Sequence, residues 1–195
     1  TVLTPEDHAI QPASAGRPVL NVETRVVDDE MRDMPLGEMG EIVHRSPQAM
    51  IGYWDKPEQT AEVFEGGWFH SGDIGYFDAD GYLFVVDRVK DIINTGGVVV
   101  SSREVEEALY THPAVAEVAV IALPDQRWIE AVTAVVCLKQ GASVTQEELI
   151  AYAKTRLAAF KVPKAVHFVD DLPRSTAGKL LKRELRRQFA AAQAA

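Results

Sequence analysis

Short stretches of alternating apolar and polar residues fill the first part of the chain, a pattern typical of half-buried strands. The pair Asp80-Gly81 predicts a turn between the last two stretches. KPEQTAEVF (56–64) predicts a short helix, and residues 1–16 are expected to form a connecting loop. The expected strands are VLNVETRVVD (19–28), GEIVHRS (40–46), WFHSGDIGYFD (68–78) and YLFVVDR (82–88). The pattern therefore predicts a β-rich unit of meander or barrel type.

Beyond Arg88 the strand pattern gives way to a mixture of strand and helix periods. Ser101 and Glu104 stand at the spacing of a capping box, as do Thr145 and Glu148, and apolar residues at helical spacing follow each pair. The other predicted elements are the strands AVAEVAVIAL (114–123), AVTAVVCLK (131–139) and KAVHFVD (164–170), and a last helix with Leu181, Leu185 and Phe189 on one face.

This change of pattern places a domain boundary near residues 87–90. The predicted fold class is α+β, with a β-rich, barrel-like subdomain over residues 1–87 and a small mixed α+β domain over residues 88–195. A length of 195 residues and a hydrophobic content of 47% are sufficient for such cores. The alanine-rich end, AAAQAA, is expected to be a frayed helix terminus.

The net charge is acidic but unevenly distributed. A formal charge of −9 disfavours nucleic acid and anionic membranes as partners, since both bind a basic surface. Residues 154–187 nevertheless hold ten Lys or Arg against three Asp or Glu, a balance of +7 that leaves −16 for the rest. Either this segment meets an anion, or its basic residues form a solvated face paired with acids elsewhere.

The remaining composition argues against a secreted, membrane-spanning or metal-binding chain. Cys137, the only cysteine, cannot form an internal disulfide and lies in an apolar run, so it is expected to be buried, as in a cytoplasmic protein. No apolar run approaches the roughly 20 residues of a transmembrane helix. The five histidines lack metal-ligand spacing, so no metal site is predicted in this chain.

Single polar motifs are ambiguous. In the segment SGD, Asp73 is most simply a turn residue that bonds its own backbone. The segment NTGG (94–97) can be a plain hairpin turn, because it lacks the frame of a phosphate-binding loop. Lys179, taken alone, is a surface lysine at the start of a basic helix.

The order of the motifs is more specific than any one of them. The run from GEIVHRS through SGD, VVDRVKD, NTGG and REVEEAL, followed by FKVP and LPRSTAGKLLKREL, closely resembles the adenylate-forming superfamily, and most of all its AMP-forming acyl-CoA synthetases, or fatty-acid–CoA ligases. The resemblance extends from about Gly16 to Phe189. It implies an enzyme that joins a carboxylic, in particular a fatty, acid to ATP and transfers the acyl group from acyl-AMP to coenzyme A.

The resemblance assigns roles residue by residue. Asp73 matches the residue that accepts hydrogen bonds from the ribose hydroxyls of ATP or AMP, and a carboxylate is suited to a diol. Arg88 matches a second contact to the nucleotide sugar, and Lys90 matches the hinge about which a mobile C-terminal domain swings between two half-reactions. By this match, residues 1–87 are the last β subdomain of the large adenylating domain.

Two further positions complete the implied site. Gly96 and Gly97 match a glycine turn that lines the pantetheine tunnel for coenzyme A, where the lack of side chains permits close approach. Lys179 matches the catalytic lysine that contacts the substrate carboxylate and the α-phosphate. A cation there stabilises the charge that accumulates as the carboxylate attacks phosphorus.

The family's triphosphate-gripping loop, most of its acyl pocket and its Mg²⁺-associated glutamate would precede Thr1. The expectation is therefore a C-terminal part of a larger cytoplasmic ligase, inactive alone and partnered by the N-terminal portion. The alternatives are an adenylation domain of nonribosomal peptide synthesis, with a carrier-protein thiol as acceptor, and a non-catalytic nucleotide-binding module.

Overall fold

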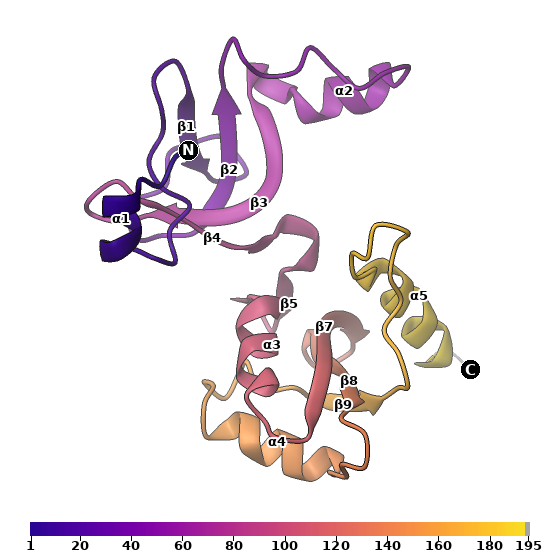
Figure 1. Ribbon diagram of the computed structural model, residues 1–195. Coiled ribbons are helices and arrows are strands. Elements are labelled where there is room, and N and C mark those ends of the chain that lie inside the picture. The colour runs from indigo at the N-terminus through magenta and orange to yellow at the C-terminus, as the bar shows by residue number, and fades with distance from the viewer. Residues whose placement is uncertain (194–195) are drawn as a thin grey trace. The chain divides into compact units, whose positions relative to one another are not determined.

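A computed structural model describes residues 1–193, and their internal contacts divide the chain into two compact units (Figure 1). The first unit is Thr1–Lys90 and the second begins at Asp91. The division falls three residues after the predicted end of the first domain at residue 87. No helix within residues 1–193 has the length and apolar character needed to cross a membrane.

The first unit is built on an antiparallel meander of four strands in the order β1-β2-β3-β4. The sheet is open, with β1 and β4 at its edges, so the strands are of meander rather than closed type. Helix α2, Pro57–Val63, and the short 3₁₀ helix η1, Glu65–Gly67, lie between β2 and β3. The strands are β1 (Glu23–Val27), β2 (Gly40–Arg45), β3 (Phe69–Phe77) and β4 (Leu83–Arg88).

Successive residues of these strands point to opposite faces, and both faces carry apolar contacts. On one face Val26 and Ile42 pack with Leu83, and on the other Val27 and Val43 pack with Trp68. The alternation read from the sequence was thus a reliable guide to the strands.

The expected loop over residues 1–16 is wrong in part, because Pro5–Ile10 forms a helix, α1. The Thr4 hydroxyl accepts the backbone N–H of Asp7 at 3.1 Å, and Pro5 occupies the first turn, where its missing N–H costs nothing. No residue of α1 is buried. The helix therefore has no apolar stripe that its sequence could have revealed.

The second unit holds a five-stranded sheet in which β8 pairs antiparallel with β5 and β7 and parallel with β9. The 3₁₀ helix η2, Val89–Asp91, precedes it. Its strands are β5 (Ile93–Thr95), β6 (Val98–Val100), β7 (Val115–Asp125), β8 (Ile129–Leu138) and β9 (Ala165–Phe168), and its helices are α3 (Ser102–Tyr110), α4 (Gln146–Lys154) and α5 (Lys182–Gln193).

Helices cover both faces of this sheet. Val105 of α3 and Leu149 of α4 belong to the cluster that contains Val120 of β7, whereas Leu185 of α5 packs in a second cluster with the adjacent residue Ile121. The alternation of neighbouring β7 residues between two apolar clusters shows that the strand is buried on both sides. The unit is a three-layer α+β structure, and the predicted fold class is confirmed.

The predicted caps also hold. Thr145 and Glu148 form a full capping box, and the Ser101 hydroxyl accepts the Glu104 N–H at 3.3 Å. Cys137 is buried in the apolar cluster against α5, as expected. Fraying is predicted for the whole alanine-rich end, residues 190–195. Helix α5 extends to Gln193 within this end, and the last two residues lie outside the described residues.

Candidate functional site

Asp73 and Arg88 face each other at paired positions of β3 and β4. The Arg88 Nε lies 2.7 Å from the Asp73 Oδ1, and the side chains retain 29% (Asp73) and 55% (Arg88) of their exposure. Asp73 lies within β3 and not in a turn. The structure thus brings together the two residues predicted to contact the nucleotide sugar, and leaves the carboxylate accessible.

The backbone before Asp73 is held by a short polar relay. The Ser71 hydroxyl donates to the Ile42 carbonyl at 2.7 Å and accepts the Asp73 N–H at 3.1 Å. This relay fixes the strand where Asp73 projects. The local backbone contact is made by the Ser71 hydroxyl, whereas the Asp73 carboxylate pairs with Arg88, so the predicted turn role of Asp73 is wrong. No spacing rule points to Ser71, because its acceptor, the Ile42 carbonyl, lies on β2.

His44 lies in the electrostatic surroundings of Asp73 and was missed by the sequence reasoning. Its Nδ1 lies 3.1 Å from the Thr24 hydroxyl on β1. Burial lowers the pKa of His44, and the Asp73 carboxylate acts in the opposite direction. The imidazole is therefore favoured in its neutral form in the folded unit.

Lys90 is exposed within η2, and the division between the two units falls directly after it. Asp91, the next residue, forms an ion pair with Arg186 of α5. The first residue of the second unit is therefore fixed to the last helix of the same unit. The hinge role of Lys90 remains a prediction.

Gly96 and Gly97 form the two-residue turn between β5 and β6, where Thr95 pairs with Val98. Both have positive φ, 64° and 83°, as a tight hairpin turn of this hand requires. The Gly96 N–H donates to the Trp128 carbonyl at 2.6 Å, and the Gly97 N–H donates to the Asn94 side chain at 3.0 Å. The hairpin interpretation is confirmed, and both glycines are exposed and free to meet a ligand.

Lys179 ends a hydrogen-bonded turn and does not begin a helix, since α5 starts at Lys182. The Ser175 N–H donates to the Lys179 carbonyl at 2.8 Å, and the Lys179 N–H donates to the Ser175 hydroxyl at 3.2 Å. The side chain of Lys179 is exposed, and its ammonium group has no hydrogen-bond or ion-pair partner within residues 1–193. The turn therefore presents an available cation on an ordered backbone.

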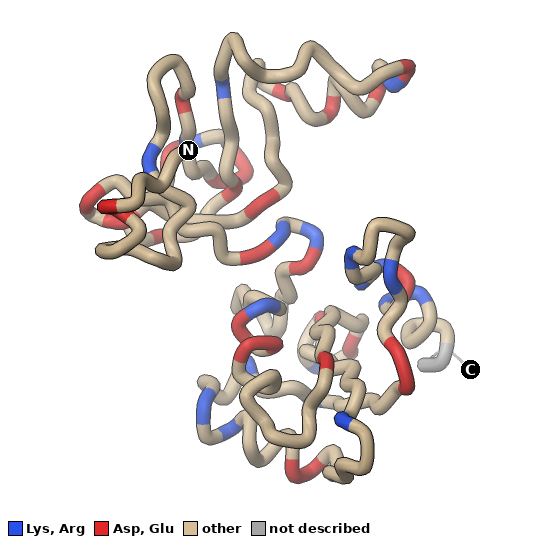
Figure 2. The backbone as a smooth tube through the Cα atoms, viewed as in Figure 1, with Lys and Arg blue, Asp and Glu red and all other residues tan. Residues whose placement is uncertain are grey.

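Most of the neighbouring basic residues are already paired, which supports the interpretation of this segment as a face matched with acids. Lys and Arg (blue) and Asp and Glu (red) are interspersed along the backbone of the second unit (Figure 2). The pairs are Lys161–Glu104, Arg174–Glu117, Lys182–Glu106, Arg183–Glu184, Arg186–Asp91 and Arg187–Glu184. Lys179 is an exception within this segment, and it is the residue for which an anionic ligand was predicted.

In the part of the chain that the structure describes, no group of three or more His, Cys, Asp or Glu side chains is arranged to hold a metal ion. The predicted site residues therefore offer a carboxylate and a guanidinium in the first unit, and a glycine turn and a free ammonium in the second. Within the first unit the carboxylate and guanidinium can bind a diol, and within the second unit the ammonium can bind an anion.

Comparison with known proteins identifies the family. The model of the AMP-binding enzymes matches residues 1–54, and that of the AMP-binding enzyme C-terminal domain matches residues 104–179. The chain is 49% identical over 176 residues to a feruloyl-CoA synthase of an Amycolatopsis species, and 46% identical over 176 residues to a long-chain-fatty-acid–CoA ligase of Bacillus subtilis. Each alignment covers 90% of this chain, but only 36% and 31% of the respective relatives.

A solved structure gives the same result for the fold. The o-succinylbenzoate CoA synthetase of Bacillus subtilis superposes with a TM-score of 0.86 at 36% identity, over 94% of this chain and 37% of that one. The chain thus spans about a third of the length of the proteins it matches. Both family models, the curated relatives and the shared fold lead to one conclusion: the chain belongs to the adenylate-forming superfamily of AMP-binding enzymes.

Proposed function

We propose that this chain supplies the nucleotide-sugar contact, the hinge and the catalytic lysine of an AMP-forming acid–thiol ligase. Such an enzyme joins a carboxylic acid to ATP with release of pyrophosphate, and then passes the acyl group from acyl-AMP to the thiol of coenzyme A with release of AMP. The observation that carries the proposal is the identity of 46–49% to two acid–CoA ligases over 90% of the chain. A cytoplasmic location is part of the same proposal, based on the single unpaired cysteine.

Asp73 and Arg88 are proposed to bind the ribose. An ionised carboxylate only accepts hydrogen bonds, so Asp73 can receive both hydroxyl protons of a ribose diol. Arg88, 2.7 Å away, keeps the carboxylate oriented and offers further N–H groups to the sugar oxygens. The B. subtilis o-succinylbenzoate CoA synthetase was solved with an acyl-adenylate, a ligand that contains this ribose.

Lys179 is proposed to act in adenylate formation. As the substrate carboxylate attacks the α-phosphate, negative charge gathers on the phosphoryl oxygens. An ammonium group with no other partner can stabilise that charge by about 3 kcal/mol or more, the scale of one preorganised donor. Mg²⁺ would accompany ATP, and the proposal assigns it no ligand in this chain.

The proposed second half-reaction uses Lys90 and the Gly96-Gly97 turn. Rotation at Lys90 would remove Lys179 from the reacting atoms and bring the glycine turn beside the pantetheine arm. A long-chain fatty acid is the first substrate to test, because the similar Bacillus subtilis protein is named a long-chain-fatty-acid–CoA ligase. Ferulate is the second substrate to test, an aromatic acid, because the similar Amycolatopsis protein is named a feruloyl-CoA synthase.

The test is acid-dependent ATP–pyrophosphate exchange, followed by thioester formation, with the full-length ligase that carries this sequence. We expect exchange with one of the acids and thioester formation with coenzyme A. The pure 195-residue chain is the matched control, and we expect no exchange from it.

Exchange by the short chain, with contaminating ligase excluded, would contradict its dependence on the N-terminal portion. Transfer to a carrier-protein thiol but not to coenzyme A would instead favour the adenylation-domain alternative. Absence of exchange with every acid tested, from an enzyme that still binds ATP, would favour a nucleotide-binding module.

A further inference from the structure

A guanidinium group fixes the turn that carries Lys179. Arg174 Nη1 donates to the Gly178 carbonyl at 3.0 Å, immediately before Lys179 in the chain. The same group donates through Nη2 to Glu117 Oε2 on β7 at 2.8 Å. A bridge between Arg174 and Leu180 closes the turn. Arg174 therefore ties the backbone beside Lys179 to a strand that is buried in the sheet.

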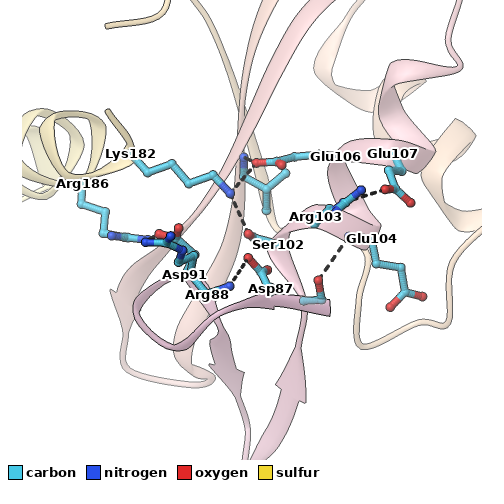
Figure 3. A network of polar contacts seen from close by, with 12 residues as sticks. Asp87, Arg88, Asp91, Ser102, Arg103, Glu104, Glu106, Glu107, Lys182 and Arg186 are labelled. Carbon is cyan, nitrogen blue, oxygen red and sulfur yellow. Dashed lines mark hydrogen bonds and ion pairs between the residues drawn. The ribbon is translucent and has the colours of Figure 1, made fainter. Parts of the chain in front are cut away.

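A buried ammonium group fixes the other side of the turn. Lys182, the first residue of α5, lies 2.7 Å from Glu106 Oε1 and 2.7 Å from the Ser102 hydroxyl, both on α3 (Figure 3). Its side chain is only 13% exposed, and Ser102 is fully buried. The Glu106 carboxylate also accepts the Val120 N–H at 2.7 Å, so it is itself held by β7.

The next turn of α5 reinforces this attachment. Arg186, four residues after Lys182 and so on the same side of the helix, pairs with Asp91 (Figure 3). Leu185, 1% exposed, packs against the sheet in the cluster of Ile121. The start of α5 is thus held by polar contacts on one side and apolar contacts on another.

We propose that Arg174 and Lys182 are positioning residues for Lys179, and this inference rests on the proposed role of Lys179 in adenylate formation. Each flanking cation is neutralised by its own acid, Glu117 or Glu106. The arrangement holds the backbone of the turn and leaves the central ammonium free for an anionic ligand. Loss of Arg174 would release the Gly178 carbonyl and leave the Glu117 carboxylate without its cation.

The first test measures the turn itself in the 195-residue chain. Trypsin cleavage of the Lys179–Leu180 bond is followed by mass spectrometry under native conditions. We expect Arg174→Gln and Lys182→Met each to accelerate this cleavage by about tenfold, since an ordered turn resists proteolysis in proportion to its local stability. Arg183→Gln is the matched control, because the Arg183 side chain is 87% exposed and its ion pair is with the adjacent Glu184.

The second test is a double-mutant cycle in the full-length ligase. Arg174→Gln and Lys182→Met should lower kcat for acyl-AMP formation by about tenfold to a hundredfold, the scale of a misplacement of about 1 Å. The KM for ATP and thioester formation from supplied acyl-AMP should stay unchanged. In a Lys179→Ala background the same substitutions should slow adenylation no further, because positioning residues act only through the lysine.

Several outcomes decide against the inference. Cleavage at wild-type rates in both variants, or an undiminished loss of kcat in the Lys179→Ala background, would overturn it. Equal loss in both half-reactions with a lowered melting temperature would mean a general structural role. If Lys179→Ala slows acyl-AMP formation but Arg174→Gln and Lys182→Met do not, the positioning roles alone are wrong. If Lys179→Ala leaves acyl-AMP formation at the wild-type rate, the proposed function of the lysine is wrong as well.

Discussion

The Arg88 guanidinium lies 2.7 Å from the Asp73 carboxylate, across directly paired positions of β3 and β4. The pair is partly exposed, so it contributes at most about 1 kcal/mol to stability. The pair matters more for the orientation of the carboxylate than for stability, because an oriented carboxylate beside a permanent cation is suited to a sugar diol. The same pair makes the nucleotide-binding proposal testable without affecting the core.

Asp73→Ala should weaken binding of both ATP and AMP to the full-length ligase. Each lost charge-assisted hydrogen bond to the ribose is worth roughly 1.5 to 3 kcal/mol, or about tenfold to a hundredfold in Kd. Isothermal titration measures both ligands. Asp80→Ala, in the turn of the same hairpin, is the control for loss of a charge. Equal affinity of wild type, Asp73→Ala and Asp80→Ala for ATP and AMP would exclude the ribose role.

Lys90→Pro should affect the two half-reactions unequally. Proline fixes φ near −65° and also restricts Val89 before it, so a rotation at this position would be hindered. Adenylate and thioester formation are measured separately, with Lys90→Ala as the control that removes only the charge. Equal loss in both half-reactions would argue against a hinge at Lys90.

Gly97→Ala should slow thioester formation and spare adenylation. A Cβ at this residue meets no atom within 4 Å, so the change costs only the strain of a positive φ, about 1–2 kcal/mol. The added methyl group would nevertheless narrow the proposed path of the pantetheine arm. Gly141→Ala is a matched control, because its φ is 77° and its Cβ site is equally open. Similar kinetics for the two variants would contradict the tunnel assignment.

His44 should make the first unit less stable as the pH falls below about 6.5, the ordinary pKa of an unfolded histidine. Burial lowers the pKa of His44, so the unfolded chain binds its proton more readily than the folded one does. The stabilising contribution is complete above that pH and decreases below it. Urea unfolding of wild type and His44→Gln between pH 7.5 and 5.5 measures the effect. We expect a shallower pH dependence in the variant, and identical slopes would contradict the account.

Elements specified by neighbouring residues could be predicted from the sequence. The Thr145–Glu148 capping box is an example, because its contacts span three residues and its motif is visible directly. Strands β5 and β6 were not predicted as strands, because each has three residues and depends on pairing with each other and with β8. Helix α1 was missed because it buries no residue.

The same distinction holds for the candidate site. Asp73, Arg88 and Lys179 could be located because motif order carries the family resemblance. Arg174 and its partner Glu117 are 57 residues apart, and no spacing rule connects them. The sequence revealed that the chain has an excess of cations near its end, but only the fold shows which of them are already paired.

The most direct measurement is the effect of Lys179→Ala on the two half-reactions of the full-length ligase. Acyl-AMP formation should slow by about a hundredfold or more, the scale of one lost preorganised donor, while thioester formation from supplied acyl-AMP stays near normal. Stability should change by no more than about 0.5 kcal/mol, because Lys179 is an exposed turn residue. Lys139→Ala, at another exposed lysine of the second unit, should leave both rates unchanged. Comparable loss in both half-reactions, or unchanged adenylation, would contradict the central claim that this lysine acts in adenylate formation.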